Sequence, residues 1–270
     1  MLYIYIAFGI ITSALISVFN IHSVSDIWII PVSLIGSLLA YAILYFLTIW
    51  IYSIFVSTKK TYGKPSNFYY NAMNRFYSLM CQIQGLKIHV TGIEKLPKDR
   101  RVLFVCNHLS QLDPMVHSSL FPERRIAFIT KISNYKIPIG GKFARRACYI
   151  PIDRENPKNA IESIHMAEGL IENNVTDIAV YPEGHRGNSY KMDEFKTGVF
   201  MIAMKTKCPV VVCTISGTER SVKKSMLKTT HVYFDILDVF ESEGQSSKNM
   251  SEKAFNMMQE NLDKRNGEKQ

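Results

Sequence analysis

The sequence predicts an α/β domain, with a mixed, largely parallel sheet flanked by helices, preceded by a hydrophobic helical hairpin. From residue 86 onward, short β-rich runs alternate with helical stretches, the pattern of a sheet with helices on its faces. Residues 1–58 contain no Lys or Arg and one acid, Asp26. The rest of the 270-residue chain holds all 32 basic residues and 22 of the 23 acidic ones, a net charge of +10. The chain therefore joins an apolar block to a basic globular part.

Two uncharged runs, 2–19 and 27–56, predict a membrane-embedded helical hairpin over residues 1–58. As helices they would be about 27 Å and about 45 Å long, against a hydrocarbon core of about 30 Å. The segment NIHSVSD between them suits a turn between antiparallel helices. A pair of helices immersed in one leaflet is the alternative. A cleaved signal peptide fits poorly, because no basic residue precedes the first run and a second apolar run follows it.

The lysines that follow the hairpin predict its orientation. Lys59, Lys60 and Lys64 come directly after the second run, whereas the connecting loop has no basic residue. The positive-inside rule therefore places the basic part of the chain on the cytoplasmic side of the membrane.

Residues 66–83 predict an amphipathic helix. Its apolar side chains recur at three- and four-residue spacing: Phe68, Tyr69, Ala72, Met73, Phe76, Leu79, Met80 and Ile83. Such a helix either packs on the core of the domain or lies in the headgroup layer. We assign residues 59–85 to the membrane interface.

Residues 86–270 predict the α/β domain itself. Strands are expected at 86–91, 102–106, 125–129, 147–152, 177–181, 209–215 and 231–236. Helices are expected at 114–120, 136–146, 157–172, 196–207 and 249–264. Glycine pairs and Gly-containing breaks mark the loops between them.

Several chemistries have no support in the sequence. The five cysteines are odd in number and lack C-x-x-C spacing, so a zinc site or a disulfide framework is disfavoured. Neither a P-loop nor a G-x-S-x-G motif is present. No nucleic-acid recognition motif is visible, and the basic surface suits anionic lipid headgroups or an acidic donor. We therefore expect no metal, no cofactor and no nucleic-acid partner.

The stretch VLFVCNHLSQLDP, residues 102–114, predicts a reactive site. Asn107 and His108 follow the expected strand, where open α/β sheets place ligands. If the chain turns between His108 and Asp113, the carboxylate can orient the imidazole as a general base. The alternative is an ordinary helix start, with Asp113 as N-cap and Pro114 at the first position. Cys106 lies within an apolar strand, which favours a buried structural thiol over a nucleophile.

Four blocks in order resemble the lysophospholipid and glycerophosphate acyltransferase family. Residues 107–113 match its N-H-x-x-x-x-D signature, and 150–154 (IPIDR) resemble the second block. Residues 181–187 (YPEGHRG) resemble the third, and 208–212 (CPVVV) the fourth. The resemblance covers roughly residues 86–220. Within that range, 195–198 (FKTG) stands where the family commonly has a similar F-K-x-G. It implies the glycerolipid acyltransferase fold and transfer of an acyl chain to the sn-2 hydroxyl of 1-acyl-sn-glycerol-3-phosphate, giving phosphatidic acid.

The resemblance also implies roles for individual residues. His108 would be the general base, oriented by Asp113. Arg154 and Arg186 would bind the phosphate of lysophosphatidate, because a guanidinium binds phosphate oxygens in bidentate fashion. Lys131 is a weaker third candidate. The donor would be acyl-CoA or acyl carrier protein, and membrane lipids are further partners.

The first and third blocks leave alternatives open. Asn107, Glu183 and Gly184 are further substrate-site candidates, with Glu183 fixing an arginine or accepting a hydrogen bond from a glycerol hydroxyl. His185 and Gly187 stand where the family usually has Thr and Ser. These departures allow another lysophospholipid or an aminolipid as acceptor. A non-catalytic lipid-binding membrane protein is the alternative of a different class.

Overall fold

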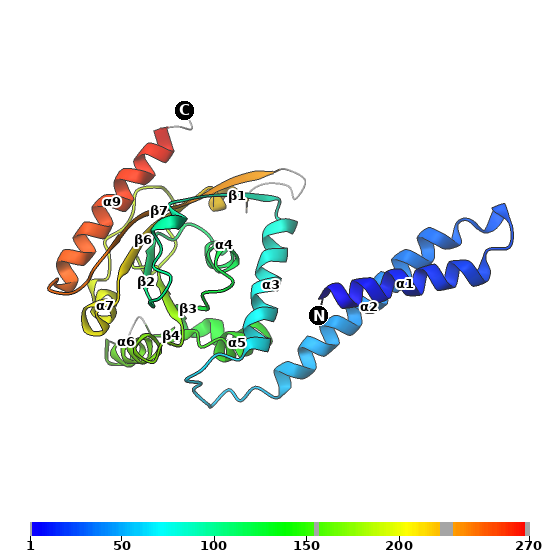
Figure 1. Cartoon of the computed structure of the whole chain (residues 1–270), viewed down its shortest axis with the longest axis horizontal. Helices are drawn as coiled ribbons and strands as arrows, with labels where there is room; N and C mark the ends of the chain where they lie inside the picture. The colour runs from blue at the N-terminus through cyan, green and yellow to red at the C-terminus, as the bar shows by residue number, and fades with distance from the viewer. Residues whose placement is uncertain (1, 154–156, 222–228, 268–270) are drawn as a thin grey trace. The chain divides into compact units, whose positions relative to one another are not determined.

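The computed structural model describes residues 2–153, 157–221 and 229–267 (Figure 1). The chain divides into two compact units, residues 1–60 and residues 61–270. The first unit is the hydrophobic hairpin. Most of the segment 59–85, which we assigned to the membrane interface, belongs to the second unit.

The hairpin consists of α1 (Leu2–Asn20) and α2 (Ile29–Ile54), joined by a loop with a 3-10 turn at Val24–Asp26. Small residues line the contact between the helices. They are Gly9 and Ser13 of α1 and Ser33 and Ser37 of α2, all of which are buried. The hydroxyls of Ser13 and Ser33 lie 3.0 Å apart. Most large apolar side chains of both helices point outward instead. By length and composition each helix can cross a membrane, which suits this apolar exterior.

A seven-stranded sheet forms the centre of the second unit, in the order β1-β7-β6-β2-β5-β3-β4. The strands are β1 (Leu86–Thr91), β2 (Leu103–Cys106), β3 (Ile126–Lys131), β4 (Ile150–Ile152), β5 (Asp177–Val180), β6 (Val210–Ser216) and β7 (Thr230–Phe240). The pair β6–β7 is antiparallel and the other neighbours are parallel. The predicted mixed, largely parallel sheet is confirmed.

The helices of this unit are α3 (Asn67–Ile83), α4 (Asp113–Leu120), α5 (Gly140–Arg146), α6 (Pro157–Glu172), α7 (Met201–Thr206), α8 (Thr218–Ser221) and α9 (Ser247–Gly267). The predicted helix 136–146 is shorter, because Pro138 lies between a 3-10 turn at Ile132–Lys136 and α5. The predicted helix 196–207 begins as a 3-10 turn at Thr197–Phe200. The predicted strand 147–152 begins only at Ile150, because Cys148 has a left-handed backbone with φ of 60°.

The two faces of the sheet carry different helices, with α3 and α4 on one side and α6, α7 and α9 on the other (Figure 1). On β2, Leu103 and Val105 belong to the core beneath α6, α7 and α9. Phe104, between them, stacks with Phe121 next to α4. This alternation places a fully buried strand directly before Asn107 and His108.

Helix α3 packs on α4 and α5 within the second unit. Tyr70, Met73 and Cys81 are buried in this contact, whereas Phe76 and Ile83 are 44% and 42% exposed. The side chain that anchors the helix is Tyr70, whose hydroxyl accepts a hydrogen bond from the N–H of Ile126 on β3 at 3.0 Å. Contact of α3 with lipid stays a prediction.

A buried ion pair ties α9 to the sheet, and its loss should be costly. Asp235 on β7 accepts hydrogen bonds from Arg265 Nε at 2.9 Å and Nη2 at 2.8 Å, and from Thr91 Oγ1 at 2.8 Å. We expect Arg265→Ala to lower the free energy of unfolding by about 3 kcal/mol, because it leaves a buried carboxylate without its cation. The exposed pair of Arg100 with Glu241 is the control, and Arg100→Ala should cost less than about 1 kcal/mol. Equal losses of melting temperature in detergent would contradict the prediction.

Candidate active site

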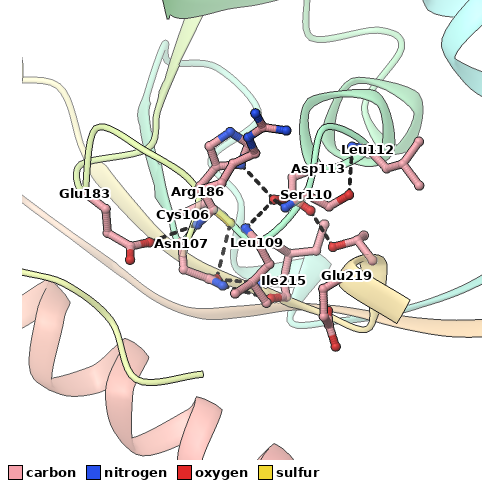
Figure 2. Close-up of polar contacts among 12 residues, drawn as sticks. Cys106, Asn107, Leu109, Ser110, Leu112, Asp113, Glu183, Arg186, Ile215 and Glu219 are labelled. Carbon is pink, nitrogen blue, oxygen red and sulfur yellow. Dashed lines mark hydrogen bonds and ion pairs between the residues drawn. The ribbon is translucent and has the colours of Figure 1, made fainter. Parts of the chain in front are cut away.

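The candidate site lies at the carboxyl ends of β2, β5 and β6, where an open α/β sheet binds its ligands. Leu103 of β2 pairs with Ile178 of β5 on one side and with Val210 of β6 on the other. The segments that follow these strands are 107–113, 181–187 and 217–219. They meet at the same edge of the sheet (Figure 2).

The structure brings His108 and Asp113 together. His108 Nδ1 lies 2.8 Å from Asp113 Oδ2. The Asp113 side chain is fully buried, whereas the His108 side chain is 17% exposed. Because an ionised carboxylate can only accept hydrogen bonds, this contact assigns the proton to Nδ1 and leaves the lone pair on Nε2.

A tight turn from Leu109 to Leu112 produces this contact, as the sequence required. The N–H groups of Leu109 and Ser110 donate to Asp113 Oδ2 at 2.6 Å and 2.7 Å. Leu112 N–H donates to Ser110 Oγ at 3.2 Å, and Asp113 N–H donates to the Ser110 carbonyl at 3.2 Å. Asp113 is therefore no ordinary N-cap, because its carboxylate binds the turn before α4 and Leu112 occupies the cap position. These four N–H groups are all engaged within the turn.

Thr218 is a second anchor of Asp113 that the sequence reasoning missed. Its Oγ1 donates to Asp113 Oδ1 at 2.5 Å, and the Thr218 side chain is fully buried. The preceding Gly217 has φ of 99°, and a Cβ there would lie 2.3 Å from the carbonyl oxygen of His231. Only glycine therefore allows the turn after β6 that delivers Thr218. In the sequence, the Gly217-Thr218 pair directly after a predicted strand was the one feature that could have indicated this contact.

Glu183 supports the backbone of His108 from the neighbouring loop. Its Oε1 accepts the N–H of His108 at 3.0 Å, and its Oε2 accepts the N–H of Asp193 at 3.2 Å. Glu183 is 2% exposed, and burial raises its pKa. Both carboxylate oxygens thus hold main chain, where we expected an arginine or a glycerol hydroxyl. Gly184, with φ of 78°, closes the turn through its N–H to the Tyr181 carbonyl at 3.0 Å.

Asn107 joins β2 to β6 beyond the end of their ladder. Its side-chain Nδ2 donates to the Ile215 carbonyl at 2.9 Å, and the Ile215 N–H donates to its Oδ1 at 2.8 Å. The residue is fully buried. In this structure Asn107 therefore fixes the position of the next residue, His108.

An aromatic ring and a buried thiol complete the surroundings of His108. The Tyr181 ring stacks on the imidazole, with ring centroids 4.4 Å apart. Cys106 is buried, and burial raises the pKa of its thiol well above the ordinary value, so it stays protonated. In the described parts of the chain, no group of three His, Cys, Asp or Glu side chains is placed to hold a metal ion.

Several proteins of known name are similar to this chain in sequence. Residues 87–216 match the family model described as Acyltransferase. A 1-acyl-sn-glycerol-3-phosphate acyltransferase from Cocos nucifera is 30% identical over 151 residues, which are 56% of this chain and 48% of the relative. A probable enzyme of the same name from Mycoplasma pneumoniae is 30% identical over 174 residues, 62% of this chain and 64% of the relative. Residues 87–216 are therefore similar to the acyltransferase family, and we call this part of the chain the acyltransferase domain.

The acyltransferase domain also has the fold of a solved relative. The crystal structure of the 1-acyl-sn-glycerophosphate (LPA) acyltransferase PlsC from Thermotoga maritima superposes with a TM-score of 0.63, at 23% identity. The match covers 82% of this chain and 88% of that one. The chain spans about half to two thirds of the length of the curated relatives named above.

Two of the predicted phosphate-binding residues lie at the same edge of the acyltransferase domain as His108. Lys131 is exposed at the end of β3, where it pairs with Ile152 of β4. Arg186 is exposed on the loop whose next residue, Gly187, donates its N–H to the His108 carbonyl at 2.8 Å. In Figure 2 the Arg186 side chain extends away from the Glu183 carboxylate. Arg154, the third candidate, lies outside the described residues.

The departures from the family pattern leave the His108–Asp113 pair intact. His185 is exposed, and its Nε2 lies 3.6 Å from Asp193 Oδ2. A Cβ at Gly187 would lie 3.5 Å from Glu183 Oε2, an ordinary contact, so the usual serine would also fit. Both differences concern the rim of the site.

Proposed function

We propose that this protein transfers a fatty acyl chain from a thioester to the sn-2 hydroxyl of 1-acyl-sn-glycerol-3-phosphate, giving phosphatidic acid for phospholipid synthesis. The observation that carries the proposal is the 2.8 Å contact of His108 Nδ1 with the buried Asp113 carboxylate. Its place at the carboxyl end of β2 and the names of the relatives support the same reaction.

The geometry supports general-base catalysis without a covalent acyl-enzyme. His108 Nε2 takes the proton of the sn-2 hydroxyl while that oxygen attacks the thioester carbonyl. The tetrahedral intermediate then collapses, the carbon–sulfur bond breaks, and the imidazolium returns its proton to the leaving thiolate. Asp113 holds the Nδ1 proton throughout and stabilises the imidazolium. The donor is acyl-CoA or acyl carrier protein.

The phosphate of the acceptor meets a cationic edge of the domain. Arg186 and Lys131 are both exposed there, on the loop beside His108 and at the end of β3. A guanidinium offers paired donors to phosphate oxygens, and an ammonium adds a point charge. Arg154 is the remaining candidate from the sequence. These residues orient the glycerol so that its free hydroxyl faces Nε2.

The hairpin supports a position of this reaction at a lipid surface. Its two helices are apolar enough to cross a membrane, so a lysolipid acceptor reaches the domain by diffusing within the bilayer. The lysines after α2 support a cytoplasmic position for the acyltransferase domain. A soluble donor then arrives from the cytoplasm.

The decisive experiment replaces His108 by Ala. We expect kcat to fall by about 10³-fold, because general-base catalysis contributes about 10² to 10⁴. Thiol release from acyl-CoA and from acyl carrier protein, measured in detergent with lysophosphatidate, gives the rate and the donor. His165→Ala is the control, because His165 is an exposed imidazole on α6 that pairs with Glu168. A normal kcat in His108→Ala would refute the base assignment.

The same assay tests the other interpretations. His185, exposed where the family usually has Thr, favours a second acceptor such as another lysophospholipid or an aminolipid. Competition between labelled lysophosphatidate and a panel of lysolipids separates these acceptors. Wild-type protein that binds lysolipid but releases no thiol from either donor would indicate a lipid-binding protein instead.

A further inference from the structure

An exposed apolar loop follows β3 at the edge of the sheet that carries His108. It comprises residues 131–138, with a 3-10 turn at Ile132–Lys136. Ile132 and Ile137 are 51% and 53% exposed. A single exposed isoleucine is common on protein surfaces. Two exposed isoleucines in one short loop instead indicate a surface that binds a membrane or another molecule.

The loop is held firmly, so the isoleucines are presented rather than left loose. Tyr135 in its centre donates its hydroxyl to the Tyr149 carbonyl, and the Arg145 guanidinium lies 4.0 Å from the Tyr135 ring centroid. Asn134 Nδ2 donates to Thr130 Oγ1 at 2.6 Å. A Cβ at Gly141 would lie 2.4 Å from the Tyr135 carbonyl oxygen, so the chain packs closely where α5 begins. Tyr135 thus points inward and both isoleucines point outward.

The charge around the loop is of one sign. From Arg124 to Ile152 the chain has seven basic residues and no acidic one. Lys131 and Lys136 are exposed directly beside Ile132 and Ile137. Arg145 and Arg146, which follow the loop on α5, lie over tyrosine rings. The exposed cations of the loop itself are Lys131 and Lys136. Apolar side chains alternating with lysines are the pattern of an interfacial membrane contact.

We propose that the loop 131–138 docks on an anionic lipid bilayer, with Ile132 and Ile137 inserted among the acyl chains and Lys131 and Lys136 bound to lipid phosphates. The proposal concerns a surface of the domain and shares one residue, Lys131, with the phosphate-binding residues proposed above. Docking in this way turns the edge of the sheet that carries His108 toward the membrane. Lipid leaving the bilayer beside Lys131 would then reach the carboxyl ends of the strands directly.

The chain offers a matched control at the opposite edge of the sheet. Ile93 is 53% exposed, the same as Ile137, and lies in the 3-10 turn Ile93–Lys95 after β1. Because β1 runs parallel to β7 and β7 runs antiparallel to β6, β1 ends at the edge away from His108. The five native cysteines are buried, so a thiol introduced at either position can be labelled selectively.

The experiment compares Ile137→Cys with Ile93→Cys in the full chain, each carrying an environment-sensitive fluorophore. The protein is reconstituted into vesicles of phosphatidylcholine, with or without one third phosphatidylglycerol, that contain lipids with a quencher on the acyl chain. We expect strong quenching at 137 in anionic vesicles, at least fivefold more than at 93. Adding Lys131→Glu and Lys136→Glu to Ile137→Cys should remove most of it.

Three outcomes would overturn the proposal. One is equal quenching at 137 and 93, which would mean that the domain touches the membrane without a preferred face. Another is no quenching at 137 in either kind of vesicle, which would leave the loop for a protein partner. The third is quenching that is unchanged by the two glutamates, which would remove the lysines from the contact. Thiol release is measured on Ile137→Cys and Ile93→Cys, which both keep Lys131, and it distinguishes a failed docking surface from an inactive enzyme.

Discussion

Asp113→Asn is expected to lower kcat by up to about 10³-fold, the loss expected for His108→Ala, with little loss of folded protein. An asparagine can keep its single oxygen toward the N–H groups of Leu109 and Ser110 and turn its amide toward the Thr218 hydroxyl, which can also accept. The turn is therefore retained. The Asn oxygen still accepts from His108 Nδ1, but the negative charge that stabilises the imidazolium is lost, so proton transfer to Nε2 becomes less favourable. Steady-state thiol release with saturating lysophosphatidate, together with melting in detergent, measures both effects.

Asp113→Ala differs from this variant in a diagnostic way. It leaves two buried N–H groups and the Thr218 hydroxyl without their acceptor, which should cost about 3 kcal/mol or more in free energy of unfolding. Thr218→Val removes only the donor to Oδ1, so its kcat should fall less, and Thr218→Ser should restore the rate. A wild-type kcat in Asp113→Asn would show that the carboxylate serves the fold alone.

Local sequence signals predicted the elements that place this site. The run of residues 102–106 is apolar on both faces, as expected for a buried parallel strand, and β2 ends within it at Cys106. The offset of five residues between His108 and Asp113 required a turn, and the turn is present. β7 is longer than predicted, at Thr230–Phe240, because Asp238, which interrupts the apolar run after residue 236, pairs with Lys253 of α9.

Contacts between distant segments were beyond the sequence. Thr218 lies 105 residues from Asp113, and only the pairing of β6 with β2 brings them together. Glu183 was expected at the substrate because the third block suggested it, yet its carboxylate holds the backbone of His108 and Asp193. A residue type gives the chemistry that is available, whereas the register of the sheet decides which partner receives it.

His117 is a buried imidazole that these signals also missed. It lies on α4, fully buried, with ring centroids of Phe104 and Phe234 each 4.9 Å away and Phe128 at 5.5 Å. Neither ring nitrogen has a hydrogen-bond partner among residues 2–153, 157–221 and 229–267. Burial lowers the pKa of His117 to about 3, so the ring stays neutral in the folded protein.

This imidazole should make the fold acid-sensitive. In the unfolded chain a histidine has a pKa of about 6.5, so below that pH the unfolded state binds a proton that the folded state does not. The contribution is complete above pH 6.5 and is lost as the pH falls toward 3, by about 1.4 kcal/mol per unit. We expect His117→Leu to remove this loss, giving a gain over wild type about 2 kcal/mol larger at pH 5 than at pH 8.

The comparison between two pH values separates titration from packing. His117→Leu also changes the fit among the phenylalanines, but that effect is the same at pH 8 and pH 5. Phe121→Leu is the control, because Phe121 belongs to the same cluster and carries no proton, with its ring centroid 5.9 Å from His117. Its melting temperature should fall in parallel with that of wild type as the pH is lowered. If His117→Leu also follows wild type in parallel, the buried imidazole is protonated in the folded state after all, and a partner for it has to exist.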